Sequence, residues 1–219
     1  MVYKPVRSWR VRIDEPEDLH LALYVRDASG LTVPGSPGTL RTAPRLTGLV
    51  PVNKRSDAVL AWHRWWGGLL TEHQQVVASQ REPHLTPIAP PDFVGLRCVT
   101  LQVAAARCWQ EGFCQWWEQP PTAELIRARP EAPIGGVRGD LIAATMAAYQ
   151  ARLVQNVVSE VERSRSRKAG PFDLMLDMLD VQGSNSIQVT PNYTLVPIGL
   201  AVDSIRYHEW LRQVITMLA

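Results

Sequence analysis

The amino-acid sequence predicts an α+β fold that is predominantly helical, with a small antiparallel sheet near the C-terminus. Apolar residues recur at helical spacing over four long segments, at 56–80, 92–118, 139–167 and 203–218. Strand-like alternation is concentrated after residue 171, at 172–181, 187–190 and 193–197. Residues 1–219 are therefore expected to form a single globular domain, with Pro/Gly-rich connectors at 30–55, 81–91 and 120–138.

The first elements are a short strand and a short helix. Residues 8–13 alternate Trp9, Val11 and Ile13 with arginines, which is typical of a half-buried strand that could extend the sheet. The acidic, proline-containing stretch 14–18 is a helix-start signal, because negative charge is favoured at a helix N-terminus. A helix over 19–27 should follow and end before Gly30.

The helix expected at 56–80 is the element around which the rest of the chain is predicted to pack. Its apolar residues form one face, whereas Trp65 lies beside that face among small residues, where a second element could approach closely. Gly67 and Gly68 are unfavourable inside a helix by about 1 kcal/mol each, so they predict a bend or a close backbone approach.

The segment 92–118 is apolar almost throughout and is interpreted as a largely buried helix. A strand over 96–103 is the alternative, because Val99, Leu101 and Val103 alternate with polar residues. The tryptophans near its end should pack against those of the 56–80 helix, since large rings favour edge-to-face contacts. These expected partners are Trp109, Trp116 and Trp117 with Trp62, Trp65 and Trp66.

Composition excludes several classes of protein. A net charge of +2 does not call for a nucleic-acid or membrane partner, and no apolar run is long enough to span a membrane. Three cysteines without a close pair indicate reduced thiols and a cytoplasmic location. Only three of the 23 basic residues are lysine, which suggests a GC-rich bacterial coding background.

Candidate chemical sites are weak. His63 and His73 lie about 80° apart around a straight helix, so they cannot bind one metal ion together. Asp173, Asp177 and Asp180 would gather on one face of a helix as a cation site, but on the favoured strand a solvated edge is expected. The sequence therefore predicts no catalytic residue, no metal site and no cofactor.

The resulting functional hypothesis is a non-catalytic protein-interaction or assembly component of a bacterial cytosolic complex, binding a protein partner or a second copy. Eight tryptophans favour it, because Trp is enriched where partners bind, and the predicted contacts are Trp65, Trp116 and Trp117. One alternative is a hydrolase-like enzyme whose site joins Cys108 or His63 to Asp173 or Asp177. Another is nucleic-acid or anion binding through the basic run of Arg163, Arg165, Arg167 and Lys168.

Overall fold

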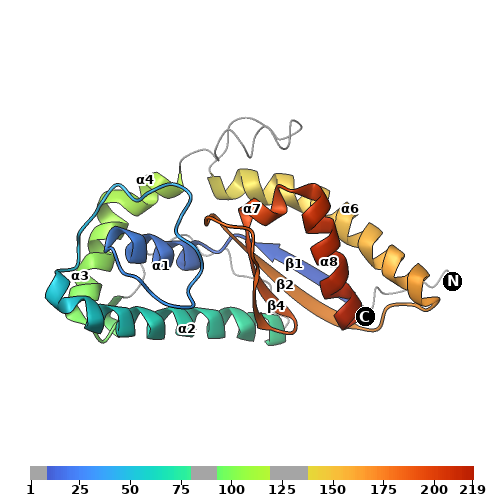
Figure 1. Cartoon of the computed structure of the whole chain (residues 1–219), viewed down its shortest axis with the longest axis horizontal. Helices are drawn as coiled ribbons and strands as arrows, with labels where there is room; N and C mark the ends of the chain where they lie inside the picture. Colours follow the sequence, from blue (N-terminus) through green and yellow to red (C-terminus); the bar gives the residue numbers. More distant parts are fainter. Residues whose placement is uncertain (1–8, 80–92, 119–137) are drawn as a thin grey trace.

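The protein is built from one four-stranded sheet with helices on both faces, as the computed structural model shows for residues 9–79, 93–118 and 138–219 (Figure 1). The predicted α+β class is confirmed, and helices predominate. The connector predicted at 81–91, and all but residue 138 of that at 120–138, lie outside the described residues. The connector predicted at 30–55 is a loop to Pro51, followed by a short 3₁₀ turn, Val52–Lys54.

The strands of the sheet are arranged in the order β1-β2-β4-β3. β1 (Trp9–Asp14), β2 (Phe172–Leu179) and β4 (Tyr193–Pro197) are parallel, and only β3 (Ile187–Thr190) is antiparallel to its neighbour β4. Within the sheet, antiparallel pairing is thus limited to the β3–β4 hairpin, so the sheet predicted as antiparallel is mostly parallel. An isolated antiparallel bridge joins Leu40 to Val181 outside the strands. The helical segment between β1 and β2 allows these two strands to run parallel, as a crossover connection does.

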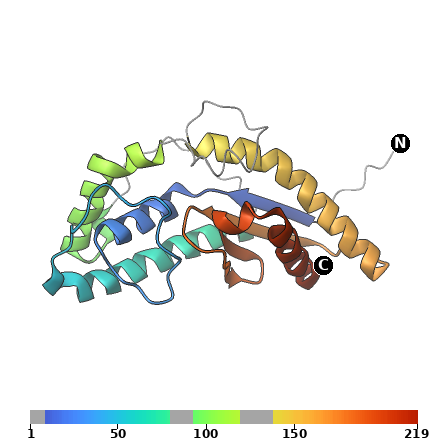
Figure 2. The ribbon, with the colours of Figure 1, turned by 45° about the horizontal axis from the view of Figure 1, so that its top comes forward.

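The N-terminal helices form a layer that extends beyond the sheet. These are α1 (Glu17–Ala28), α2 (Arg55–Ser79), α3 (Val99–Cys108) and α4 (Cys114–Trp117), with a π-helical turn, Trp109–Phe113, between the last two. Of these helices, α2 reaches along one face of the sheet. Figures 1 and 2 show α2 running from the end of the molecule formed by α3 toward the sheet. The helical interpretation of the 92–118 segment is confirmed from Val99 onward, and the alternative strand over 96–103 is wrong.

α1 lies at the centre of this helical layer. Nine of its twelve residues are buried, so it is covered on nearly every side. On one side Trp62 stacks on Trp66 and donates its indole N–H to the carbonyl of Ala22 in α1, at 2.7 Å. On another, α4 packs two tryptophans against the rings of His20 and Tyr24. The tryptophans of α2 and those of α4 therefore belong to one core, and both sets pack against α1.

α2 continues without interruption through its two internal glycines. A Cβ added at Gly67 or Gly68 would meet no atom of the described residues within 4 Å outside the helix itself. Among the described residues, the close backbone approach that was one of the two roles predicted for these glycines is therefore not found, and both positions are exposed.

The other face of the sheet is covered by the C-terminal helices α6 (Arg138–Arg165), α7 (Ile198–Ala201) and α8 (Ser204–Leu218). Their core is mainly aliphatic and takes the alternate residues Leu174, Leu176 and Met178 from β2. Asp203 begins α8 by accepting a hydrogen bond from the Arg206 backbone N–H, as the cap predicted there would do. None of the helices in the described ranges combines the length and apolar character needed to cross a membrane.

Candidate functional site

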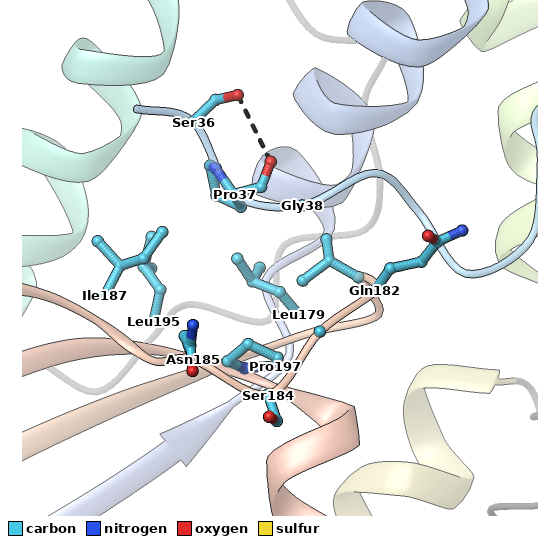
Figure 3. A pocket seen from close by; sticks show the side chains of 12 residues that line it. Ser36, Pro37, Gly38, Leu179, Gln182, Ser184, Asn185, Ile187, Leu195 and Pro197 are labelled. Atoms are coloured by element: carbon cyan, nitrogen blue, oxygen red, sulfur yellow. Dashed lines mark hydrogen bonds between the residues drawn. The ribbon is translucent and has the colours of Figure 1, made fainter. Parts of the chain in front are cut away.

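A pocket of about 250 Å³ lies at the carboxyl edge of the sheet, where β2 and β4 both end (Figure 3). Its floor is made by apolar side chains of the strands, including Leu179, Leu195 and Ile187. One wall is the loop through Pro37, and the other is the turn that carries Ser184 and Asn185. Ligands of sheets with parallel strands commonly bind at this edge, beyond the carboxyl ends of the strands.

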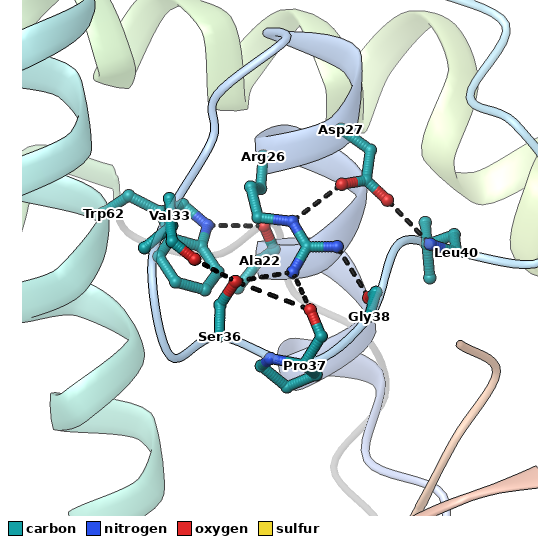
Figure 4. A network of polar contacts seen from close by, with 9 residues as sticks. All are labelled: Ala22, Arg26, Asp27, Val33, Ser36, Pro37, Gly38, Leu40 and Trp62. Carbon is teal, nitrogen blue, oxygen red and sulfur yellow. Dashed lines mark hydrogen bonds and ion pairs between the residues drawn. The ribbon is translucent and has the colours of Figure 1, made fainter. Parts of the chain in front are cut away.

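The loop wall is held by a buried arginine (Figure 4). Arg26 of α1 is 3% exposed, and its guanidinium donates to the carbonyl oxygens of Pro37 and Gly38 at 2.6 and 2.8 Å. It also donates to the Ser36 hydroxyl at 3.2 Å and to the Asp27 carboxylate at 2.7 Å. We call this set the Arg26 clamp. Because it is a multiply hydrogen-bonded and paired charge, burial of the guanidinium is tolerated.

The clamped loop is also joined directly to the strand end. The Gln182 N–H donates to the Thr39 carbonyl at 2.7 Å, and the Arg41 N–H donates to the Asp180 carbonyl at 3.0 Å. A Cβ at Gly38 would lie 2.4 Å from the Gln182 carbonyl oxygen, so only glycine permits this approach. Both walls of the pocket are therefore preformed.

The lining of the pocket is uncharged. Of the twelve described residues that line it, none has an ionisable side chain, and the polar ones are Ser36, Gln182, Ser184 and Asn185. Six are large aliphatic residues or prolines. The chemistry that this lining favours is the burial of an uncharged apolar group, with hydrogen bonds available at the rim.

A cluster of polar side chains lies between the helices α1 and α2 and the sheet, outside the pocket lining. His73 of α2 contacts Asp177 of β2 through Nδ1 at 2.9 Å and Asp18 of α1 through Nε2 at 3.0 Å. Tyr193 of β4 donates to the same Asp177 oxygen at 2.6 Å. We call these four residues the His73 network. It links α1, α2, β2 and β4.

The protonation of His73 follows from its two carboxylate neighbours. Burial by itself lowers the pKa of His73, but the hydrogen bonds to Asp177 and Asp18 outweigh it and raise the pKa to about 10. Burial raises the pKa of the Tyr193 hydroxyl, and the negative charge of Asp177 raises it further. Burial also raises the pKa of Asp177, against the lowering by His73 and Tyr193. Because each ring nitrogen of His73 faces a carboxylate oxygen, the geometry favours the imidazolium that donates from both nitrogens, and Tyr193 donates to Asp177.

This arrangement resembles half of a catalytic triad but is satisfied on both sides. A general base needs a free imidazole nitrogen, whereas both nitrogens of His73 already contact carboxylates. The carboxylates also lie on opposite sides of the ring, and the described residues contain no group of ligands that could hold a metal ion. The geometry assigns the His73 network to joining helices and sheet.

Sequence reasoning considered His73 and Asp177 but did not predict that they pair, and it did not single out the other residues of the network or the clamp, although signals were present. Asp177 is fully buried rather than part of the expected solvated edge. It lies on the same side of β2 as the core residues Met175 and Leu179. A carboxylate in line with apolar residues on one face of a strand was therefore the available signal of its burial. Arg26, inside an otherwise apolar helix, was the corresponding signal for the clamp.

The residue pairs proposed for an enzyme are not the pairs that the structure forms. Asp177 bonds to His73 and Tyr193, and Asp173 pairs with Arg10 at 3.5 Å. His63 is exposed on α2. Burial raises the pKa of the Cys108 thiol to about 12, and a thiol in that state is a poor nucleophile.

The three tryptophans predicted to contact a partner have different environments. Trp116 and Trp117 are 2% and 7% exposed, so both rings are core residues and a partner could reach them only if α4 opened. Trp65 is partly exposed, and its ring meets Phe93 edge-on at 6.3 Å. A partner contact at Trp65 stays a prediction.

The predicted anion-binding residues lie at the end of α6 and are exposed. Arg165 donates to the Thr216 carbonyl at 2.6 Å and Arg167 to the Ala219 carbonyl at 3.2 Å, which ties α6 to the end of α8. Lys168 pairs with Glu162 at 3.0 Å. Arg163 and two of the others line a shallow hollow, and anion binding there stays a prediction.

Comparison of the chain with protein-family models, with curated proteins and with solved structures gave no match.

Proposed function

We propose that this chain is a non-catalytic binding component of a bacterial cytosolic protein complex, and that a protein partner places an uncharged group in the pocket at the carboxyl edge of the sheet. The observation that carries the proposal is the preformed, uncharged lining of that pocket. A pocket with both walls held in place binds without the ordering cost that a loose loop would impose.

The distribution of charge supports binding rather than catalysis. The imidazolium of His73 is engaged by two carboxylates, and the guanidinium of Arg26 is engaged by Asp27 and the loop carbonyls. These buried charges hold elements together and do not line the pocket. Acid–base or nucleophilic chemistry would need such a group at the place where the ligand sits.

The test uses two tryptophan substitutions that differ in position but not in chemistry. Asn185 is exposed at the pocket rim, and Gln188 is exposed on β3 outside the pocket lining. Asn185→Trp should cover the pocket, whereas Gln188→Trp adds the same ring elsewhere. Wild type and both variants are used to capture partners from the native host and are sized by light scattering.

We expect one partner to be retained in stoichiometric amount by wild type and by Gln188→Trp, and retention to fall at least tenfold with Asn185→Trp. Equal retention by the two variants would exclude the pocket as the contact. A strict monomer without a partner at micromolar concentration would contradict the interaction proposal as a whole. Equal thermal midpoints for the two variants establish that folding is not the cause of a loss.

A further inference from the structure

A second hollow adjoins the pocket across the Ser184–Asn185 turn. It has a volume of about 340 Å³, and both turn residues line the hollow as well as the pocket. Its far side is α8, which presents Arg206, Glu209 and Gln213. These three positions are spaced by three and four residues, so they lie on one face of the helix, and all are exposed.

The hollow and the pocket differ in chemistry. The hollow carries one cation, one anion and two carboxamides, whereas the pocket is uncharged. Arg206 also donates to the Ser184 hydroxyl at 3.1 Å, so the cation is bonded to the turn that separates the two. The turn itself is tightly placed, because a Cβ at Gly199 of α7 would lie 2.6 Å from the Gly183 carbonyl oxygen.

We infer that the pocket and the hollow together form one two-part site for an extended peptide segment of a protein partner. An uncharged apolar side chain of the segment enters the pocket, and a polar side chain farther along lies against α8. This inference rests on the proposed function and names the chemistry of the partner.

The size and polarity of the pocket favour one apolar side chain of a peptide over a phosphate-bearing cofactor. The pocket of about 250 Å³ is smaller than sites for drug-sized ligands, which span roughly 300–1,000 Å³. An engineered apolar cavity of roughly 150 Å³ holds benzene, so the pocket has room for one leucine- or phenylalanine-sized side chain. Phosphate-bearing ligands need cations or helix N-termini, and the pocket lining has no cationic side chain among the described residues.

Anchoring by side chains is also favoured over addition of a strand to the sheet edge. β3 has four residues, and its pairing with β4 shifts register between Gln188 and Thr190. Short, bulged edge strands are poor templates for a further strand. Recognition then depends on which side chain enters the pocket.

The experiment titrates the full chain with blocked tripeptides, observed through the methyl NMR signals of Leu179, Leu195 and Ile187. The probes are acetyl-leucyl-alanyl-glutaminamide and its aspartyl analogue, which differ only in the side chain offered to the pocket. We expect the leucyl peptide to shift the three methyl signals with a dissociation constant at least tenfold below that of the aspartyl peptide. Affinities within twofold of each other would overturn the assignment of an uncharged anchor.

Variants separate the two parts of the site. Asn185→Trp should weaken the leucyl peptide at least tenfold, and Gln188→Trp should leave its affinity unchanged. Gln213→Ala, on α8, should weaken it two- to fivefold without changing which methyl signals shift. If Gln213→Ala has no effect, the hollow is not part of the site.

The inference and the proposed function can fail separately. If neither peptide binds, but Asn185→Trp still abolishes retention of the native partner, the peptide inference is wrong and the proposed function stands. If the leucyl peptide binds and the native partner is retained equally by both tryptophan variants, the pocket binds peptides but is not the partner contact. If both results are negative, both proposals fall.

Discussion

The two faces of the sheet are stabilised in different ways. The core that α1 to α4 share with one face of the sheet is rich in aromatic rings and contains the buried ionisable residues His20, Arg26 and Asp177. The face under α6 to α8 has a mainly aliphatic core, with Val157, Leu176 and Ile215 among its fully buried residues. In the aliphatic core, the fit of packed side chains sets the positions of the helices. In the aromatic core, directional hydrogen bonds also set the positions of the helices and of the loop.

This difference explains why the pocket lies beside the polar face. A loop has no regular backbone pairing of its own, so the loop through Pro37 needs donors from elsewhere. Arg26 supplies three of them from the centre of the helical layer, in the contacts to Ser36, Pro37 and Gly38. The stability of the protein and the shape of the pocket therefore depend on the same side chain, and the following predictions test that dependence.

The largest effect is expected for Arg26→Met. The substitution leaves Asp27 without its buried partner and the Pro37 and Gly38 carbonyls without their donor. We expect the free energy of unfolding to fall by about 4 kcal/mol, as is usual when one member of a buried pair is removed. Denaturant unfolding measures it. Arg107→Met removes an exposed arginine paired to Glu111 and should leave the midpoint unchanged, so equal losses would contradict a special role for the clamp.

His73→Gln should have the next largest effect, about 3 kcal/mol at pH 6, because it removes a charge that two carboxylates surround. The loss should also depend on pH. The pKa of His73 is raised to about 10 in the folded protein, against roughly 6.5 when unfolded. Its contribution is therefore fully present below about pH 6.5 and declines as pH rises toward 10.

Two matched variants separate this pH dependence from other effects. His63→Gln makes the same change at an exposed histidine of the same helix and should leave the free energy of unfolding unchanged at pH 6. Ile215→Val, in the aliphatic core, should cost about 1 kcal/mol at every pH between 6 and 10. If the wild type and His73→Gln have parallel profiles of unfolding free energy over that range, His73 is not protonated as described.

Gly38→Ala should cost about 2 kcal/mol, because the new methyl group meets the Gln182 backbone carbonyl and must displace the loop. Binding of the leucyl peptide should weaken as well, since the displaced loop is a wall of the pocket. Thermal unfolding and the methyl titration measure the two effects. A variant with wild-type stability would show that the loop yields freely and that the pocket is not rigidly preformed.

The smallest effect has the opposite sign. Gly67→Ala should stabilise the protein by about 0.5–1 kcal/mol, because alanine is the better helix former and the position is open. Thermal unfolding in parallel with Gly68→Ala checks it, since that position has the same surroundings. Destabilisation by either alanine would indicate that the glycines serve a contact beyond the described residues.

Local patterns were sufficient to predict most elements. Period-two alternation located β1, β2 and the hairpin strands, and helical periodicity located α2, α6 and α8 within a few residues. The turn predicted around Gly183 lies between β2 and β3, and the cap predicted at Asp203 begins α8. Such signals depend on neighbours in the chain, so a single sequence contains them.

The candidate site could not be predicted in the same way. The pocket joins the loop through Pro37 to a strand end about 140 residues later, and the contact between them is made by Gln182 and Thr39. His73 meets Asp177 across 104 positions of sequence. Pairings over such separations depend on strand order, which no local periodicity encodes.

The sequence by itself determined the fold class, the type of most elements and the apolar faces that they bury, because spacing along the chain sets which side chains share a face. Only the tertiary structure decided that α1, rather than α2, is the centre of the helical layer, and that Asp177 is buried beside His73. The physical reason is that burial and ion pairing depend on what is packed against a residue. That partner comes from a distant part of the chain.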